Sequence, residues 1–292
     1  MTGPPLPEVL IDRSLKAAID GVAGTFATVD DAETLALQSD IAAPLRAHPQ
    51  WLMLCRTLSS FIDDRGYVVV RGLEPDEGRS LLVLASVLKA TFDTYKPGKI
   101  VKHFRMSPWT TELSHTTRAG DFHTDGNIST TPPFATAMQC EHEDPGAPEY
   151  AEQRVVFLPD LLERLGSLDR IDTDALCFLT EEEVAMTHER AAAVWRGRLV
   201  QGDTIRYHPH SLRMADMRLG LARPNLESII ASIHRAALDA STPFHTGPGD
   251  TVLVSNRTAL HYRGACSVRF VRFPAEFESR SLYVLHMKDP VV

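Results

Sequence analysis

The sequence Phe122-His123-Thr124-Asp125-Gly126-Asn127 contains a histidine and a carboxylate two residues apart. In an extended backbone, residues i and i+2 point to the same face, so His123 and Asp125 would offer an imidazole nitrogen and a carboxylate oxygen to one point in space. Two such ligands hold a metal ion weakly, and a lone His-x-Asp is most often a surface pair. A metal site therefore requires a third ligand elsewhere in the chain.

The best candidate for this third ligand is His261, which lies 136 residues after Asp125. It follows a turn signal at Gly249-Asp250 and a strand-like run over 251–254. Two histidines and one carboxylate on one side of a metal form the facial triad of non-haem Fe(II) oxygenases, which leaves positions open for oxygen and substrate. His208 and His210 form a second i, i+2 pair, but they have no carboxylate at a matching spacing, and we interpret them as loop residues.

The composition is that of a globular protein that is not a general nucleic-acid binder, and small anionic ligands remain possible. The 292 residues are 43% hydrophobic, which allows a sizeable core, and the net charge of -8 argues against general binding of nucleic acid. No run approaches the roughly 20 apolar residues of a membrane span. The four scattered cysteines and the lack of a signal-peptide pattern favour a reducing cytoplasm. The oligomeric state is left open by the sequence.

The hydrophobic pattern predicts one domain over residues 1–292, in which residues 1–64 are mostly helical. Further helices are expected from about Asp76 to Phe92 and over 225–240, and an exposed acidic loop is expected over 141–152. The predicted strands cover 66–73, 98–106, 134–140, 154–158, 204–207, 251–254 and 280–286. Many short strands among helices indicate a β-sandwich or barrel with helical additions.

Four segments, in this order, resemble the Fe(II)/2-oxoglutarate-dependent dioxygenases, specifically their clavaminate synthase-like and taurine dioxygenase-like branch. They are 66–73, 122–125, 249–250 with 256–263, and 280–282, and the resemblance extends from Gly66 to Leu285. It implies a mainly β fold with helical additions, built on a double-stranded β-helix (jelly roll). It also implies a biosynthetic oxygenase that uses Fe(II), 2-oxoglutarate and O2 to hydroxylate an unactivated C–H bond of a small metabolite.

The resemblance assigns roles to individual residues. His123, Asp125 and His261 would bind Fe(II), and 2-oxoglutarate would chelate the metal. Arg280 would bind the far carboxylate of 2-oxoglutarate, because a guanidinium presents a planar fork of donors that matches a carboxylate. Arg272 is the runner-up, since it lies closer to His261 in sequence. The carboxylate of Asp125 favours oxygenation, because related halogenases have Gly or Ala at that position.

Two positions depart from the family pattern. Val155 stands where the family often has a threonine that helps to hold the co-substrate. Val284 stands where it often has a second arginine that contacts an acidic substrate. A simple sulfonate is therefore not the expected substrate, and we expect a free amino acid or a similarly small zwitterion.

Charged residues outside the metal motif are candidates for binding this zwitterion. Arg206 or Arg213 would bind its carboxylate. The acidic loop, including Glu141 and Asp144, would lie near its ammonium group as a lid.

Two alternatives remain open at this point. The same family includes desaturases and cyclases that act on larger biosynthetic intermediates. A jelly-roll protein can also bind a metal or ligand without turnover, because a fold does not imply a function. Arg280 discriminates against the second alternative, since metal binding alone does not need it.

Overall fold

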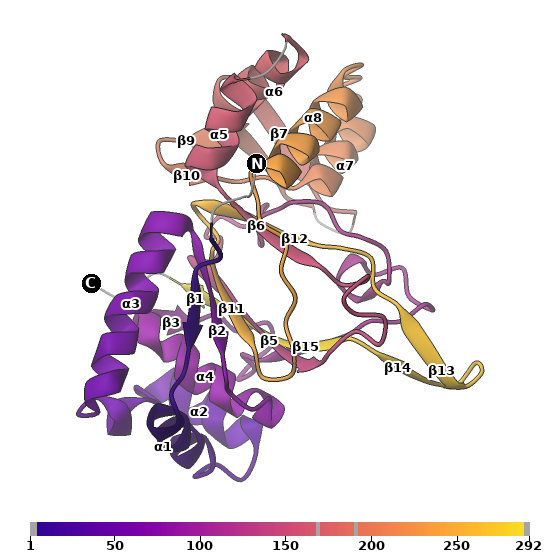
Figure 1. Cartoon of the computed structure of the whole chain (residues 1–292). Coiled ribbons are helices and arrows are strands. Elements are labelled where there is room, and N and C mark those ends of the chain that lie inside the picture. Colours follow the sequence, from indigo (N-terminus) through magenta and orange to yellow (C-terminus); the bar gives the residue numbers. More distant parts are fainter. Residues whose placement is uncertain (1–4, 168–169, 190–191, 289–292) are drawn as a thin grey trace.

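The centre of the molecule is a seven-stranded sheet (Figure 1) in the order β1-β2-β11-β5-β15-β3, with β4 paired to β15. The computed structural model describes residues 5–167, 170–189 and 192–288. β1 runs parallel to β2, and the other neighbours are antiparallel. The strands are β1 (Glu8–Leu10), β2 (Tyr67–Arg71), β3 (Thr91–Phe92), β4 (Lys102–Arg105), β5 (Ala135–His142), β11 (Thr251–Ser255) and β15 (Ser281–Lys288).

Four N-terminal helices cover one face of this sheet (Figure 1): α1 (Arg13–Ala23), α2 (Val29–Gln38), α3 (Pro49–Arg65) and α4 (Arg79–Ala85). Their apolar side chains pack against alternate strand residues, among them Val68, Val70, Ala137, Leu253 and Leu285. Because side chains alternate between the two faces of a strand, the intervening residues point to the opposite face. The helices therefore leave that opposite face available for a site.

Local sequence explains where these helices begin and end. Asp12 accepts hydrogen bonds from the backbone of Ser14 and Leu15 at the start of α1, and Thr28 forms a capping box with Asp31 at the start of α2. Gly66 ends α3 in the left-handed conformation, with φ of 74°, and the chain passes directly into β2. A Cβ at this position would lie 2.8 Å from that of Ala259, so the turn requires glycine.

The opposite face of the sheet packs against an antiparallel pair, β6 (Gln153–Phe157) and β12 (Ala259–Arg263). The apolar residues between the two sheets include Val69, Val155, Phe244, Val252 and Val254. The far side of the β6–β12 pair is covered by α5 (Leu158–Gly166), α6 (Arg170–Thr180) and α8 (Leu226–Asp239). The layers are thus helices, large sheet, small sheet and helices (Figure 1).

The remaining elements lie at the ends of these layers. β7 (Glu183–Thr187) pairs with β8 (Val194–Arg198) and packs against α7 (Pro209–Leu219), and β9 (Val200–Gln201) pairs with β10 (Thr204–Ile205). The hairpin of β13 (Val268–Arg272) and β14 (Glu276–Ser279) projects from the body of the molecule (Figure 1). Short 3-10 turns cover Ala43–Leu45, Asp76–Gly78, Ser86–Leu88 and Leu113–His115.

Most predicted strands are present, and a mixed sheet with helical additions agrees with the expected mainly β class. The predicted helix over 76–92 is wrong in its second half, because α4 ends at Ala85 and a 3-10 turn and β3 follow. The predicted exposed loop over 141–152 is also partly wrong, since β5 continues to His142 and Asp144 is only 4% exposed. None of the described helices has the length and apolar composition needed to cross a membrane.

Candidate metal centre

His123, Asp125 and His261 come together between the two sheets, with their ligand atoms all within 4.8 Å of one another. Nε2 of His123 lies 3.8 Å from Oδ1 of Asp125, and Nε2 of His261 lies 3.7 Å from Oδ2. Among the described residues, this is the one group of three such side chains that could hold a metal ion. Two imidazoles and a carboxylate suit a divalent transition metal with open coordination positions.

The backbone around Asp125 is fixed by side chains far away in sequence. The amide of Asp125 donates to Oδ1 of Asn256 at 2.7 Å, and Nδ2 of Asn256 donates back to the Asp125 carbonyl at 2.9 Å. The same Asn256 amide also reaches the carbonyl of Pro133 at 3.1 Å. Asn256 is 4% exposed, so these bonds are shielded from water and hold the carboxylate in one place.

Both histidines can offer Nε2 to a metal. Nδ1 of His123 lies 2.8 Å from the carbonyl of Asp121, which places the proton on Nδ1 and leaves the lone pair of Nε2 for a metal. Burial lowers the pKa of His261 to about 4, with a further contribution from His123, so its imidazole is neutral near pH 7. Nδ1 of His261 is buried without a hydrogen-bond partner in the described structure.

Asp125 is held as a carboxylate. Burial raises its pKa, but attraction to the protonated form of His261, the contact with His286 and attraction to protonated His123 outweigh burial and keep the pKa well below its usual range. Thr136 donates its hydroxyl to Oδ2 at 2.7 Å. A carboxylate beside two imidazoles is the donor set that a divalent metal requires.

Arg280, which directly precedes β15, is buried and lacks a counter-ion. It is 2% exposed, its Nη1 has no hydrogen-bond partner, and its Nη2 lies 3.5 Å from Oγ1 of Thr246. No described carboxylate forms an ion pair with it, and burial lowers its pKa. A buried, uncompensated guanidinium is costly, so this side chain fits a site for an anionic ligand.

An apolar strip lies between Arg280 and the triad. Leu282, Val284 and His286 pair with Cys140, Met138 and Thr136 of β5, so these side chains share one face of the sheet. Val155, which pairs with His261 on β12, faces them from the small sheet. Val155 and Val284 are each 4% exposed. Val155 and Val284, the two positions with valine in place of a polar residue, therefore form buried apolar surface beside the triad.

The other candidate arginines have different environments. Arg272 is highly exposed on the projecting hairpin, 3.9 Å from Glu276. Arg213 forms ion pairs with Asp121 at 3.0 Å and Glu227 at 2.9 Å, so its charge is already compensated. Arg206 lies 5.0 Å from the ring of Trp195 and is partly buried, and it pairs with no described carboxylate.

The two predicted acidic lid residues are engaged in other contacts. Glu141 lies on the helix-covered face of β5 and accepts hydrogen bonds from Ser281 at 2.5 Å and Tyr283 at 2.6 Å. Asp144 is buried and accepts from the backbone of Ser267 and Gly146, each at 2.9 Å. The structure does not bring Glu141 to the face of the sheet that carries the triad.

Sequence reasoning gave no role to Thr136, Asn256 or His286, which contact Asp125 directly; Asn256 entered only as part of the segment 256–263. A signal existed for His286, because counting by twos from Arg280 places residue 286 on the same strand face.

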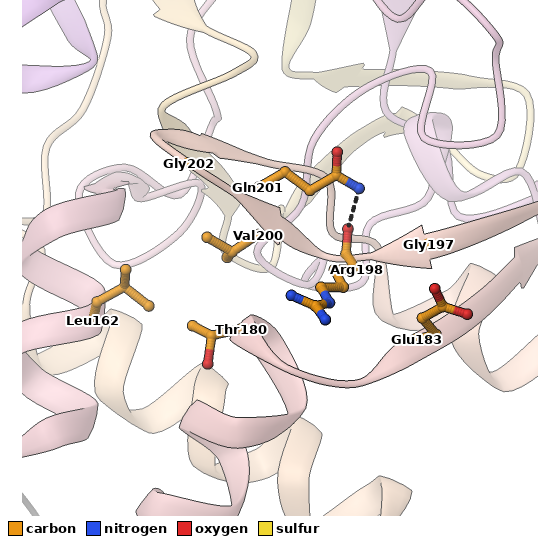
Figure 2. A pocket seen from close by; sticks show the side chains of 8 residues that line it. All are labelled: Leu162, Thr180, Glu183, Gly197, Arg198, Val200, Gln201 and Gly202. Carbon is orange, nitrogen blue, oxygen red and sulfur yellow. Dashed lines mark hydrogen bonds between the residues drawn. The ribbon is translucent and has the colours of Figure 1, made fainter.

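A hollow of about 640 Å³ lies elsewhere, against α5, α6 and β7 to β9, and its lining includes Leu162, Thr180 and Arg198 but none of the triad (Figure 2). Because this hollow contains no residue of the triad, we place the candidate site at the side chains around Asp125 and not in the hollow.

Neither a protein-family model nor a curated protein matches the sequence. Solved structures do match. Asparagine oxygenase in complex with Fe(II), 2S,3S-3-hydroxyasparagine and succinate is 16% identical, with a TM-score of 0.72 over 96% of this chain and 93% of that chain. The non-heme iron oxygenase OrfP in complex with Fe and alpha-ketoglutaric acid is 14% identical, with a TM-score of 0.68 over 97% and 94%. A variant of OrfP in complex with (3S)-hydroxy-L-Arg is 14% identical, with a TM-score of 0.70 over 97% of this chain and 94% of that chain. Along nearly its whole length, the chain has the fold of these non-heme iron oxygenases.

Proposed function

We propose that this protein is an Fe(II)- and 2-oxoglutarate-dependent oxygenase that hydroxylates an unactivated C–H bond of a free amino acid or a similarly small zwitterion. The observation that carries the proposal is the open triad of His123, Asp125 and His261 together with the buried, uncompensated Arg280. A metal-binding protein without turnover needs the triad but has no use for this arginine. The shared fold with asparagine oxygenase and OrfP supports the same assignment.

We further propose that the two facing sheets form a double-stranded β-helix (jelly-roll) core and that residues 1–292 are a single domain. The large sheet and the β6–β12 pair enclose the apolar layer that includes Val69 and Val254. The mostly helical part over 1–64 would belong to this domain, because α1 to α3 share one hydrophobic core with the large sheet. A separate N-terminal domain would need a core of its own.

Each residue of the site has a defined task in this proposal. Nε2 of His123, the carboxylate of Asp125 and Nε2 of His261 would hold Fe(II), which with 2-oxoglutarate and O2 supplies the oxidising power for the reaction. Arg280 would bind and orient the far carboxylate of 2-oxoglutarate through a planar fork of donors. Val155 and Val284 would exclude water from the co-substrate, which strengthens these electrostatic contacts.

The substrate class rests on the charges around the site. With valine at 284, Arg206 is the arginine we assign to the substrate carboxylate, because Arg213 is already paired with Asp121 and Glu227. The structures of asparagine oxygenase and OrfP hold hydroxylated amino acids, which favours a substrate of this class. A larger biosynthetic intermediate, or desaturation and cyclisation of it, is the alternative outcome of a substrate screen.

The test is succinate formation. The purified protein would be incubated with Fe(II), 2-oxoglutarate, O2 and each standard amino acid, and both succinate and a product heavier by one oxygen would be measured. We expect at least one amino acid to stimulate both signals in the native protein and none to do so in the Asp125→Ala variant. Metal binding without succinate formation for any substrate would support the non-catalytic alternative.

A further inference from the structure

A fourth polar side chain reaches the carboxylate of Asp125. Nε2 of His286 lies 3.4 Å from Oδ2 of Asp125, although sequence reasoning gave His286 no role. We propose that His286 is a positioning residue which, together with Thr136, restricts Asp125 to a single bond with the metal. This inference rests on the metal site of the proposed function, and it concerns the geometry of that site.

The two oxygens of Asp125 have different surroundings. Thr136 donates to Oδ2 at 2.7 Å, and the imidazole of His286 contacts the same oxygen. Oδ1 accepts no hydrogen bond from a described residue and faces Nε2 of His123 at 3.8 Å. Thr136 and His286 occupy the lone pairs of Oδ2, which Nε2 of His261 also approaches at 3.7 Å, so Oδ1 is the oxygen with free lone pairs for the metal.

His286 approaches Asp125 from a different direction than the metal ligands do. Thr136 of β5 and His286 of β15 are directly paired across the large sheet, so they present their donors from one rigid surface. His123 lies in the loop before β5, and His261 lies on β12 of the small sheet. His286 is also outside the group whose ligand atoms lie within 4.8 Å of one another. Two side chains from the large sheet therefore hold Oδ2 of the carboxylate, while the histidine ligands approach it from the loop and from the small sheet.

The number of Asp125 oxygens that bind the metal decides how many coordination positions of the metal stay open. A carboxylate bound through one oxygen leaves the open side of the triad available for a bidentate co-substrate and for oxygen. If Oδ2 were released from Thr136 and His286, Asp125 could rotate and bind through both oxygens. That would occupy a position which 2-oxoglutarate needs. The two donors thus protect the open positions of the metal as well as the orientation of Asp125.

Co(II) is a suitable probe, because its visible spectrum reports both affinity and coordination number without turnover. We would titrate Co(II) into the native protein and into the variants His286→Leu, His286→Gln, Thr136→Val and the double variant His286→Leu with Thr136→Val. The matched control is His142→Gln on β5, whose side chain is 71% exposed. 2-Oxoglutarate would then be titrated into each Co(II)-loaded protein.

We expect His286→Leu to weaken Co(II) binding by about 10- to 100-fold, which is typical for the loss of an outer-sphere partner. His286→Gln should stay within about 3-fold of the native protein, because its amide can donate from nearly the same position. The double variant should weaken binding of both Co(II) and 2-oxoglutarate by more than the product of the single effects, since the two donors share one oxygen. His142→Gln should match the native protein.

The other outcomes are distinguishable. Native affinity and spectrum in His286→Leu would overturn the positioning role and leave His286 as a packing residue. A lowered coordination number in both His286 variants would overturn it in favour of direct metal ligation. If the native protein binds no Co(II), the metal site of the proposed function fails, whatever His286 does. Thermal unfolding of the metal-free variants checks that each is folded. If His286→Leu does not fold, His286→Gln is the variant with which the role of His286 is still tested.

Discussion

The main chains of His123 and His261 are hydrogen-bonded to each other in both directions, with N–O distances of 3.1 Å each way. This bridge joins the loop before β5 to β12, so backbone atoms hold together two side chains that are distant in sequence. A substitution at either residue removes an imidazole and leaves the bridge in place. Loss of function can therefore be separated from loss of fold at this site.

Replacing any one of His123, Asp125 and His261 with alanine should reduce activity by more than about 100-fold, because three ligands are the minimum for an open metal site. Since the backbone bridge and the bonds of Asn256 to the backbone of Asp125 remain, the far-UV circular dichroism spectrum should be unchanged. Succinate release measures the effect, and His245→Ala is the control, because His245 lies outside the described group of side chains that could hold a metal. Full turnover by His261→Ala, with loss in the control, would identify His245 as the third ligand instead.

Replacing Arg280 with alanine should weaken 2-oxoglutarate binding by about 2–5 kcal/mol, the range for losing one partner of a buried charged pair. Metal affinity should change little, since Arg280 does not contact the triad. Arg272→Ala is the matched control, because that side chain is highly exposed and near Glu276. Calorimetric titration of 2-oxoglutarate into the metal-loaded proteins measures both. A larger effect from Arg272→Ala would transfer the role to that arginine.

Replacing Asn256 with alanine should lower the free energy of unfolding by about 2–3 kcal/mol, because it removes three hydrogen bonds of a buried side chain and leaves their backbone partners unsatisfied. It should also weaken metal binding, since Asp125 loses the contacts that fix its backbone. Urea denaturation and metal titration measure the two effects. Native metal affinity in a destabilised Asn256→Ala protein would show that Thr136 and His286 suffice to place the carboxylate.

The sequence was sufficient to propose the triad, because each piece carries a local signal. Period-two spacing links His123 to Asp125, and a turn followed by a strand points to His261. Arg280 came from the family resemblance, and its burial could not be read from the sequence, where an arginine at a strand end normally faces water. The predicted strand 280–286 contained the geometry that places His286 beside Asp125, but no local pattern says which neighbour a strand pairs with.

The errors came from tertiary context. The helix predicted over 76–92 has suitable apolar spacing, yet Lys89 adopts a positive φ of 53° and the chain then pairs with β15 as β3. The acidic stretch after Cys140 was expected to be solvated. Instead, Glu141 and Asp144 accept hydrogen bonds from residues within 267–283. Contacts between residues so far apart in sequence are not encoded in local propensity.

The hydrogen bonds of Glu141 predict a pH dependence of stability. Burial raises its pKa, but donors from Ser281, Tyr283 and His103 outweigh burial and lower the pKa to about 2, from a usual value of 4.5. A lowered folded-state pKa stabilises the protein above about pH 4.5, and this contribution is lost as the pH falls toward 2. The side chain is partly exposed, so we expect about 1–2 kcal/mol after solvent screening.

The variant Glu141→Gln should therefore be less stable than the native protein at pH 7, and the difference should shrink as the pH falls below about 4.5. Urea denaturation at several pH values measures this, with the exposed Glu143→Gln as the control. A difference between Glu141→Gln and the native protein that stays constant down to pH 3 would show that Glu141 stabilises through its shape and not its charge.

The substrate prediction depends on Arg206. Nη1 of Arg206 donates to the carbonyl of Ser129 at 2.8 Å, and the guanidinium lies 5.0 Å from the ring of Trp195. The other nitrogens of the guanidinium have no hydrogen bond to a described residue, so the side chain is held in place and still has donors available for a ligand. A site built in this way rejects analogues without a carboxylate, because its own charge would be left unsatisfied.

We expect a screen of the standard amino acids and common amine metabolites to give at least one compound that stimulates 2-oxoglutarate consumption and gains one oxygen. Its amide or decarboxylated analogue should be a far weaker substrate. Arg206→Ala should raise the KM for the amino acid by about 10-fold or more, which corresponds to the loss of a charged hydrogen bond, and leave 2-oxoglutarate affinity unchanged. Arg196→Ala, an exposed arginine on the same strand as Trp195, should behave as the native protein. Turnover only with carrier-bound or terpenoid-like compounds, unaffected by Arg206→Ala, would replace the small zwitterion with a larger substrate, and the assignments of the metal ligands and Arg280 would still stand.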